Sequence, residues 1–217
     1  MVLNFIFSIV CLIGILIVAW TSLSYFTTRG IEEPKYILIK KFPEFEIREY
    51  SPYIIAYTDV FSSFNGSSTS GFRILANYIF GGNLSSKKIK MTAPVIQEPT
   101  SEKIEMTAPV IQEKSDSGYQ IAFIMPQKYT LSTLPQPIDS RVKIKEVKKE
   151  IRAVYTFKGW TTEKKVKSKQ NNFIRLLEEN NLVYKQIKLA QYDPPYTPPY
   201  MRKNELHATL NGFDSEN

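Results

Sequence analysis

The stretch that decides the fold runs from Lys87 to Glu113 and reads KKIKMTAPVIQEPTSEKIEMTAPVIQE. Residues 88–98 recur as residues 103–113, and only Lys90 changes, to Glu105. Each copy begins with alternating side chains, which is typical of a strand with one buried face. The proline of each copy lacks an amide donor and therefore fits a strand edge or a bend. We expect a long hairpin whose two arms are near-identical copies. The alternative is a slipped duplication that leaves one copy as a surface loop.

An apolar segment opens the chain. No charged side chain precedes Arg29, and the run from Leu3 to Trp20 is almost continuously apolar. A helix needs about 20 such residues to cross the hydrocarbon core of a bilayer. A cleavable signal peptide, the alternative, would show a basic start and a shorter apolar run. The sequence therefore predicts a retained, single-pass transmembrane anchor over residues 1–28.

The residues around this segment give information about the side of the membrane on which the domain lies. Basic residues follow the span and none precedes it: Arg29, Lys35, Lys40 and Lys41. This bias favours a cytoplasmic domain. Glycosylation sequons begin at Asn65 and Asn83, but they would matter only in a secretory compartment. The single cysteine, Cys11, lies in the anchor, so redox chemistry gives no information about the compartment.

Periodicity divides the rest of the chain into a linker (29–35), one domain (36–211) and a polar tail (212–217). Strands are predicted over residues 36–40, 45–48, 53–60, 119–125, 142–145, 151–157, 182–189 and 205–210. Apolar residues at helical spacing predict helices over residues 71–80, after a Ser/Gly-rich loop at 61–70, and over residues 161–180. The order strands, helix, strands occurs twice, which predicts an α+β domain with an internal pseudo-repeat and helices packed on a curved antiparallel sheet.

The net charge of +7 raises the question of a nucleic-acid partner. Lysines cluster near residues 87–90, 143–149 and 164–169. A nucleic-acid surface would be accompanied by an aromatic-rich RNA motif, a helix-turn-helix or a zinc spacing, and none is present in the sequence. We interpret the lysines as a solvated basic surface that also suits anionic headgroups beside an anchored domain. No nucleic-acid partner is expected, and a protein partner stays open.

Several short blocks occur in a fixed order and spacing. They are Phe42-Pro43-x-Phe45-Glu46-Ile47-Arg48, Gly71-Phe72-x-x-Leu75, Tyr78-Ile79-Phe80-Gly81-Gly82-Asn83, Lys88-Ile89-x-Met91-Thr92-Ala93-Pro94-Val95, Phe123-x-Met125-Pro126, Leu134-Pro135, Tyr192-Asp193-Pro194-Pro195 and Arg202-Lys203-Asn204-Glu205. Through these blocks the chain resembles the SOUL heme-binding protein family from Tyr36 to Leu210. The resemblance implies a distorted antiparallel β-barrel with two flanking helices, preceded here by one N-terminal transmembrane helix.

The resemblance also implies a function. It implies binding of heme or a related tetrapyrrole in a shallow apolar groove beside the first helix, by a carrier or buffer that is not an enzyme. With the anchor, this predicts a membrane-anchored tetrapyrrole-binding protein. The alternative is an anchored module of the same fold that binds a protein or a lipid headgroup and no heme. An enzyme would need an acid or base that the sequence does not identify, and no metal-ligand spacing occurs.

The resemblance directs the binding site to the first helix and to the Tyr/Pro-rich loop. The predicted cofactor-binding residues are Arg73, Ile74, Asn77 and Tyr78 on the helix, and Tyr196, Tyr200, Met201 and Arg202 on the loop. Arg73 would pair with a propionate, and Tyr78, Tyr200 or Met201 could ligate iron. The alternative is that the loop residues only pack onto the barrel. The duplicated strands carry no chemistry that requires two copies, so we expect them to be scaffold.

The lone histidine is expected to take no part in binding. His207 alternates with Leu206 and Ala208, whose side chains would share the buried face of the last strand. The sequence therefore predicts that His207 points the other way, as a polar surface residue, and no axial ligand is assigned.

Overall fold

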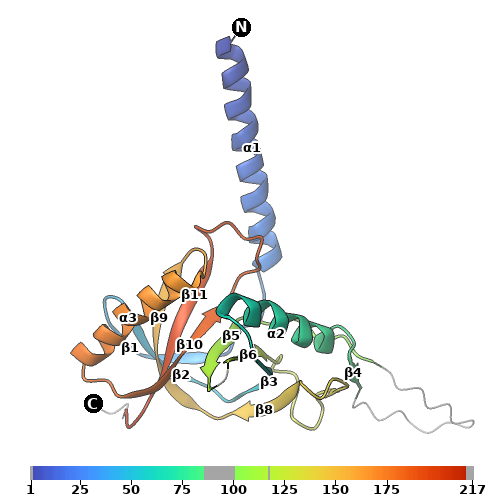
Figure 1. Ribbon diagram of the computed structural model, residues 1–217, viewed down its shortest axis with the longest axis vertical. Helices are drawn as coiled ribbons and strands as arrows, with labels where there is room; N and C mark the ends of the chain where they lie inside the picture. The colour runs from blue at the N-terminus through green and yellow to red at the C-terminus, as the bar shows by residue number, and fades with distance from the viewer. Residues whose placement is uncertain (1, 86–100, 117, 214–217) are drawn as a thin grey trace, which may run out of the picture.

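The computed structural model describes residues 2–85, 101–116 and 118–213. A curled sheet carries two helices, and a third, N-terminal helix stands away from it (Figure 1). The first copy of the duplicated motif, residues 88–98, lies outside the described residues, so the first arm of the predicted hairpin is not described.

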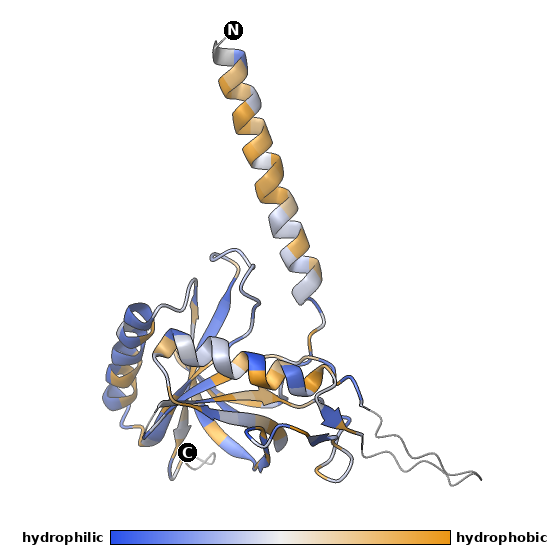
Figure 2. Ribbon diagram, turned by 45° about the vertical axis from the view of Figure 1, so that its right-hand side comes forward, coloured by the Kyte–Doolittle hydropathy of each residue, from blue (hydrophilic) through white to orange (hydrophobic). Residues whose placement is uncertain are grey.

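The N-terminal helix, α1, spans Val2–Thr28, and Figure 2 shows it as hydrophobic over most of its length and paler in the turns nearest the domain. Its segment Asn4–Thr28 is long and apolar enough to cross a membrane, a property that signal sequences share. The described side chains of this segment are almost all exposed, because the helix stands apart from the core.

The sheet has nine antiparallel strands in the order β1-β2-β9-β11-β10-β5-β6-β3-β8. The strands are β1 (Tyr36–Lys41), β2 (Glu46–Tyr50), β3 (Tyr53–Val60), β5 (Val110–Ser115), β6 (Gly118–Ile124), β8 (Lys143–Val147), β9 (Glu150–Lys158), β10 (Tyr184–Gln191) and β11 (Lys203–Leu210). A separate two-stranded sheet pairs β4 (Asn83–Leu84) with β7 (Gln136–Pro137). The eight strand ranges predicted from the sequence are confirmed, with boundaries shifted by up to two residues.

The predicted pseudo-repeat is confirmed by the strand order. The unit β2-β3-α2-β5-β6 is repeated as β8-β9-α3-β10-β11, and the two halves meet where β10 pairs with β5. The first strand of each unit pairs with the second strand of the other unit, β2 with β9 and β8 with β3. This exchange of strands makes the two halves a single sheet.

Both domain helices cover the same face of the sheet. The register places Leu206, Leu189, Gln112 and Ile121 opposite one another across β11, β10, β5 and β6. α3 (Glu163–Glu179) packs with Leu206 and Leu189 in one core, and α2 (Phe64–Ile79) packs with Ile121 in another. Burial of apolar side chains between helix and sheet is the main stabilising contribution.

α2 is longer than predicted. Residues 64–70, expected to be loop, form its first two turns, so that prediction is wrong. The helix begins early because the Ser63 hydroxyl caps it by accepting a hydrogen bond from the Gly66 amide (3.4 Å). Gly71 lies against β6, where an added Cβ would be 2.4 Å from Ile121 Cγ1, so glycine permits this close packing. α3 agrees with its prediction and is capped by Thr162.

The second copy of the duplicated motif contributes β5 to the main sheet. Residues 110–112 in β5 already pair on one side with β6 and on the other with β10. Both edges of residues 110–112 are therefore occupied, whereas the predicted hairpin between the copies involves residues 88–98 and lies outside the described part of the chain. The motif nevertheless lies beside α2, because buried Ile104 packs on Leu75 and donates its amide to the carbonyl oxygen of Ile79 (2.8 Å).

The Asn83 sequon lies in the interior. Asn83 is 1% exposed, its Nδ2 donates to the carbonyl oxygens of Tyr78 (2.7 Å) and Glu102 (2.8 Å), and its Oδ1 accepts from the Glu102 amide (3.0 Å). A glycan on Nδ2 would break these bonds. Asn83 is therefore a structural residue that ties the end of α2 to the duplicated segment.

We expect Asn83→Ala to lower the free energy of unfolding by about 2–3 kcal/mol, because it leaves buried backbone groups without partners. Asn65→Ala is a matched control, since Asn65 is exposed in the first turn of α2 and should change stability by less than about 0.5 kcal/mol. Urea unfolding of the full-length protein in detergent, followed by tryptophan fluorescence, measures both. Equal effects of the two variants would contradict the structural role of Asn83.

Candidate functional site

The first part of the predicted binding surface lies on α2. Arg73 and Asn77 are exposed and Ile74 is half-buried, so they point outward as predicted. Tyr78 requires a correction, because it is 1% exposed and donates its hydroxyl hydrogen to the carbonyl oxygen of Pro135 (2.7 Å). Burial raises the pKa of Tyr78 above its usual range. It lies in the core and cannot line a surface groove.

The second part is the loop between β10 and β11, residues 192–202, which is called the Tyr/Pro loop below. Tyr196 and Tyr200 are about half exposed, and Met201 is half-buried. The carbonyl oxygen of Tyr196 accepts a hydrogen bond from Trp20 Nε1 (2.6 Å), and the Tyr200 hydroxyl bonds to Thr21 Oγ1 (2.6 Å). This loop therefore packs against the C-terminal part of α1.

The Arg202 side chain lies in the interior of the same loop. It is 8% exposed, and its guanidinium donates to the carbonyl oxygens of Thr197 (2.9 Å from Nε), Pro194 (3.2 Å from Nη2) and Pro195. The guanidinium carbon also lies 3.9 Å from the centroid of the Trp160 ring. The predicted role of Arg202 as an open cation is therefore wrong. Between the loop and α2, the described residues make no hydrogen bond, ion pair or ring contact.

His207 is buried, contrary to the prediction. It is 1% exposed and lies in β11 opposite Lys188 and Val154, on the face away from the helices. Its Nε2 is 2.8 Å from Glu205 Oε2, and its Nδ1 is 3.3 Å from Arg152 Nη1. A neutral imidazole with its proton on Nε2 satisfies both contacts, since it donates to the carboxylate and accepts from the guanidinium.

A buried ionic network surrounds this histidine. Burial lowers the pKa of His207 to about 4. Burial opposes ionisation of Glu205, but hydrogen bonds from His207 and Tyr192 and the charge of Arg48, whose Nη1 is 3.1 Å from Glu205 Oε1, hold the Glu205 pKa below its usual range. The adjoining hollow has a volume of only about 40 Å³. Both ring nitrogens of His207 thus have hydrogen-bond partners, and the hollow beside it is too small to admit a macrocycle.

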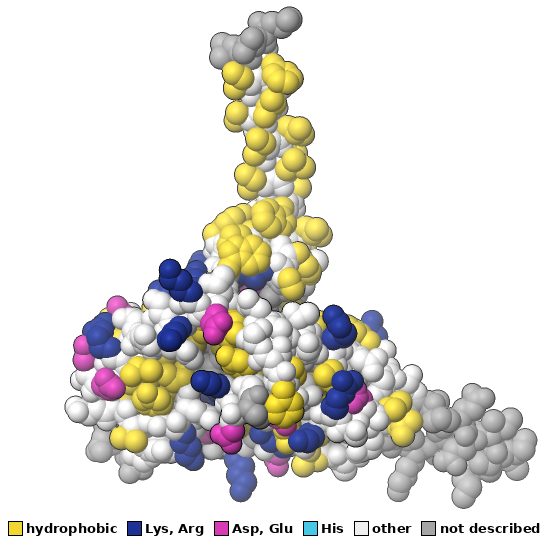
Figure 3. Space-filling model, viewed as in Figure 1, with side chains coloured by type: hydrophobic (Ala, Val, Ile, Leu, Met, Phe, Trp, Pro, Cys, Tyr) yellow, Lys and Arg dark blue, Asp and Glu magenta, His cyan; other side chains and the backbone are white. Residues whose placement is uncertain are grey.

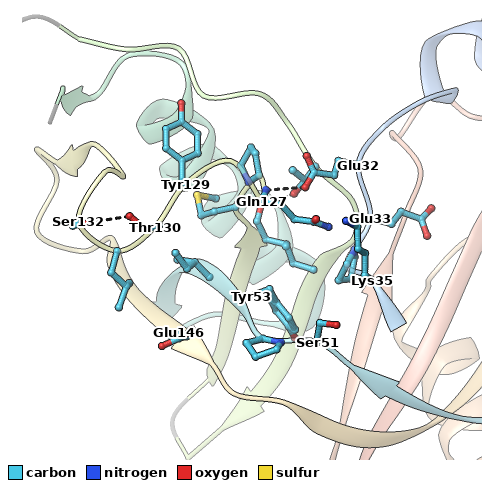
Figure 4. A pocket seen from close by; sticks show the side chains of 18 residues that line it. Glu32, Glu33, Lys35, Ser51, Tyr53, Gln127, Tyr129, Thr130, Ser132 and Glu146 are labelled. Carbon is cyan, nitrogen blue, oxygen red and sulfur yellow. Dashed lines mark hydrogen bonds between the residues drawn. The ribbon is translucent and has the colours of Figure 1, made fainter. Parts of the chain in front are cut away.

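A larger cavity, of about 530 Å³, lies where the linker enters the domain (Figure 4). Ligand pockets typically measure about 300–1,000 Å³. Half of the lining side chains are apolar or aromatic. The lining consists of Glu32, Glu33, Pro34, Lys35, Ser51, Pro52, Tyr53, Ile54, Thr107, Ile124, Met125, Pro126, Gln127, Tyr129, Thr130, Leu131, Ser132 and Glu146.

The second copy of the duplicated motif builds one wall of this cavity. The Thr107 hydroxyl donates to the carbonyl oxygen of Ile124 at the end of β6. The next amide, of Ala108, donates to the carbonyl oxygen of Glu32 in the linker (2.9 Å). The motif therefore joins the linker to the sheet, and it lines the cavity through Thr107 in addition to supporting it.

Charge at the cavity is partly compensated. Glu32 Oε1 accepts a hydrogen bond from the backbone amide of Gln127 (2.7 Å), as Figure 4 shows. The Glu33 carboxylate forms an ion pair with Lys203 (3.1 Å). Lys35 is the one cation of the described lining. A negatively charged ligand would therefore be oriented with its charge toward Lys35.

The cavity residues fit a tetrapyrrole in two respects and lack a third. They offer a half-apolar space of suitable size and a cation for a propionate, but the described lining contains neither histidine nor cysteine, and among its side chains only Tyr53, Tyr129 and Met125 are of types that ligate heme iron. Sequence reasoning missed this site because its walls come from several distant segments. The available signal was the set of prolines that end the strand-like runs at its rim: Pro34, Pro52 and Pro126.

Comparisons with known proteins identify a family for the chain. Residues 31–209 match the family model described as SOUL heme-binding protein. The chain is 30% identical to "Heme-binding protein 2" of Homo sapiens over 156 residues, which covers 70% of this chain and 71% of that protein. Both findings support a role in binding heme or a related tetrapyrrole.

Solved structures show the same fold at much lower identity. The EcmrR C-terminal domain is 8% identical with a TM-score of 0.53, covering 78% of this chain and 98% of that one. EcmrR in its complex with DNA gives a TM-score of 0.54 at 8% identity, covering 97% of this chain and 70% of that one. At such identity the likeness concerns the fold alone.

The buried histidine predicts a specific pH dependence. Because the folded-state pKa of His207 is about 4 against an ordinary value of 6.5, the unfolded chain binds more protons between these values. Stability should therefore fall by about 2 kcal/mol from pH 7 to pH 5. His207 is the only histidine in the chain, so urea unfolding of His207→Gln should show little slope in this window. An unchanged slope in the variant would contradict the assignment.

Proposed function

The chain belongs to the SOUL heme-binding protein family, and on this premise we propose that it is a membrane-anchored carrier or buffer of heme or a related tetrapyrrole. The observation that carries the proposal is the 530 Å³ cavity beside the linker that follows α1. α1 would be retained as a single-pass anchor, and the basic residues after it favour a cytoplasmic domain. The proposed activity is binding without catalysis.

In this proposal the cavity residues hold the ligand by apolar contact and by one ion pair. Ile54, Met125 and Leu131 would contact the macrocycle, and Lys35 would pair with a propionate. Bound heme would supply a redox-active iron, but no histidine or cysteine of the described lining is placed to ligate it. Holding the macrocycle out of water would keep a poorly soluble ligand monomeric.

The outer face of α2 is the competing location. Arg73, Ile74 and Asn77 are accessible there, and the family resemblance directs attention to this helix. This face offers a cation and a partly apolar surface. Single-residue variants on each surface distinguish the two locations.

Titration of the full-length protein in nanodiscs, corrected for ligand taken up by empty nanodiscs, tests the proposal. Without histidine ligation, hemin and metal-free protoporphyrin IX should bind with dissociation constants within about fivefold of each other. Lys35→Gln should weaken both by about threefold to fivefold, because it removes about 1 kcal/mol of exposed charge attraction. Arg73→Gln is the matched control and should leave both unchanged.

Three results would oppose this account in different ways. A large preference for hemin that disappears in His207→Gln would show histidine ligation. Weakening by Arg73→Gln alone would move the site to α2. The absence of any saturable absorbance change with either ligand would favour an anchored interaction module that binds no heme.

A further inference from the structure

α1 is longer than the hydrocarbon core of a bilayer. Its apolar segment Asn4–Thr28 has 25 residues, which span about 37 Å as an α-helix, whereas the core is about 30 Å thick. The composition also changes within the helix. Six of the eight residues from 21 to 28 carry a hydroxyl group, whereas the fifteen residues before Trp20 carry one, on Ser8. The hydrocarbon therefore ends near Trp20, and about 12 Å of helix continues beyond it.

The Tyr/Pro loop contacts α1 at this depth. Its two hydrogen bonds to the helix go to Trp20 and Thr21, through the Tyr196 carbonyl and the Tyr200 hydroxyl. In Figure 1 the loop rises from the sheet to the last turns of α1, and in Figure 3 hydrophobic side chains gather at the base of that helix. The loop thus lies at the level where the helix leaves the hydrocarbon.

The loop is built with few unsatisfied backbone donors. Four of its residues are prolines and have no amide hydrogen: Pro194, Pro195, Pro198 and Pro199. The amides of Thr197 and Met201 donate to the carbonyl oxygens of Pro194 (3.1 Å) and Pro198 (3.0 Å). The buried Arg202 guanidinium donates to the carbonyl oxygen of Pro194 as well and to two further loop carbonyls, those of Thr197 and Pro195. A segment in which many backbone groups are bonded or lack an amide hydrogen tolerates a layer with little water better than an open loop does.

Exposed aromatic side chains project from this loop. Tyr196 is 51% exposed and Tyr200 is 53% exposed. Trp160, which is 46% exposed, is stacked on the loop through Arg202. Tyrosine and tryptophan are enriched where membrane meets water, because their rings are apolar and their polar groups remain hydrated.

We propose that the Tyr/Pro loop and Trp160 form a membrane-docking surface that lies in the headgroup layer of the bilayer spanned by α1. The domain is then held against the lipid surface at two places, the anchor and this loop. The cavity, whose wall includes residues 32–35 directly after α1, lies next to the bilayer, so that a tetrapyrrole dissolved in lipid reaches it without crossing bulk water. This inference rests on the proposed anchoring by α1.

The test uses the full-length protein in phosphatidylcholine vesicles and a single fluorescent label at one of three positions. Native Cys11, the only cysteine, reports on insertion, because it lies about 14 Å from Trp20 along the helix. In a Cys11→Ser background, Tyr196→Cys reports on the loop. Val183→Cys is the matched exposed control, since Val183 is 64% exposed and β10 separates it from the loop by about 27 Å.

Quenchers placed in the lipid chains, on the lipid headgroups and in water give the depth of each label. The expected result is chain-nitroxide quenching at position 11 and headgroup-nitroxide quenching at position 196. Iodide quenching at position 196 should be about threefold lower than at position 183. If position 11 is quenched from the chains but positions 196 and 183 behave alike, the docking surface is overturned and the anchor stands. If position 11 is quenched by iodide, the anchoring itself fails, and the docking surface fails with it.

Discussion

Residues 32–35 are bonded to several separate parts of the domain, and this junction determines both where α1 stands and where the cavity lies. The Glu32 carbonyl accepts from Ala108, its carboxylate accepts from the Gln127 amide, and the Lys35 carbonyl accepts from the Ser51 amide (3.1 Å). A linker held at successive residues loses the freedom of a flexible tether. The position of α1 and the shape of the cavity are therefore coupled through these hydrogen bonds.

The two faces of the sheet differ in composition. One face is covered by α2 and α3 and is apolar, and it provides the stability that the rest depends on. The opposite face carries the buried network of Arg48, Glu205, His207 and Arg152. Buried charges are tolerated when each has a partner, and here Glu205 and Arg152 occupy both ring nitrogens of the only histidine. Under the proposed function, binding would therefore depend on shape and apolar contact more than on histidine ligation of iron.

The sequence predicted the fold well and the burial of several candidate site residues poorly, for physical reasons. Alternation and helical spacing are local properties, so the strands, α3 and the pseudo-repeat could be found from them. The early start of α2 was missed because Ser63 and the close packing of Gly71 against Ile121 override a Ser/Gly-rich composition. Tyr78, Arg202 and His207 were misplaced because their burial depends on tertiary partners such as Pro135, Thr197 and Glu205, which no local pattern reveals.

The central claim is that the ligand occupies the cavity beside the anchor, and methyl NMR tests it most directly. Labelled methyl groups of Met125, Met201 and Ile74 report on the cavity, the Tyr/Pro loop and α2. Paramagnetic hemin added to the full-length protein in nanodiscs should broaden the Met125 signal most, whereas diamagnetic zinc protoporphyrin should broaden none of the three. Strongest broadening of Ile74 or Met201, with Met125 unchanged, would contradict the account.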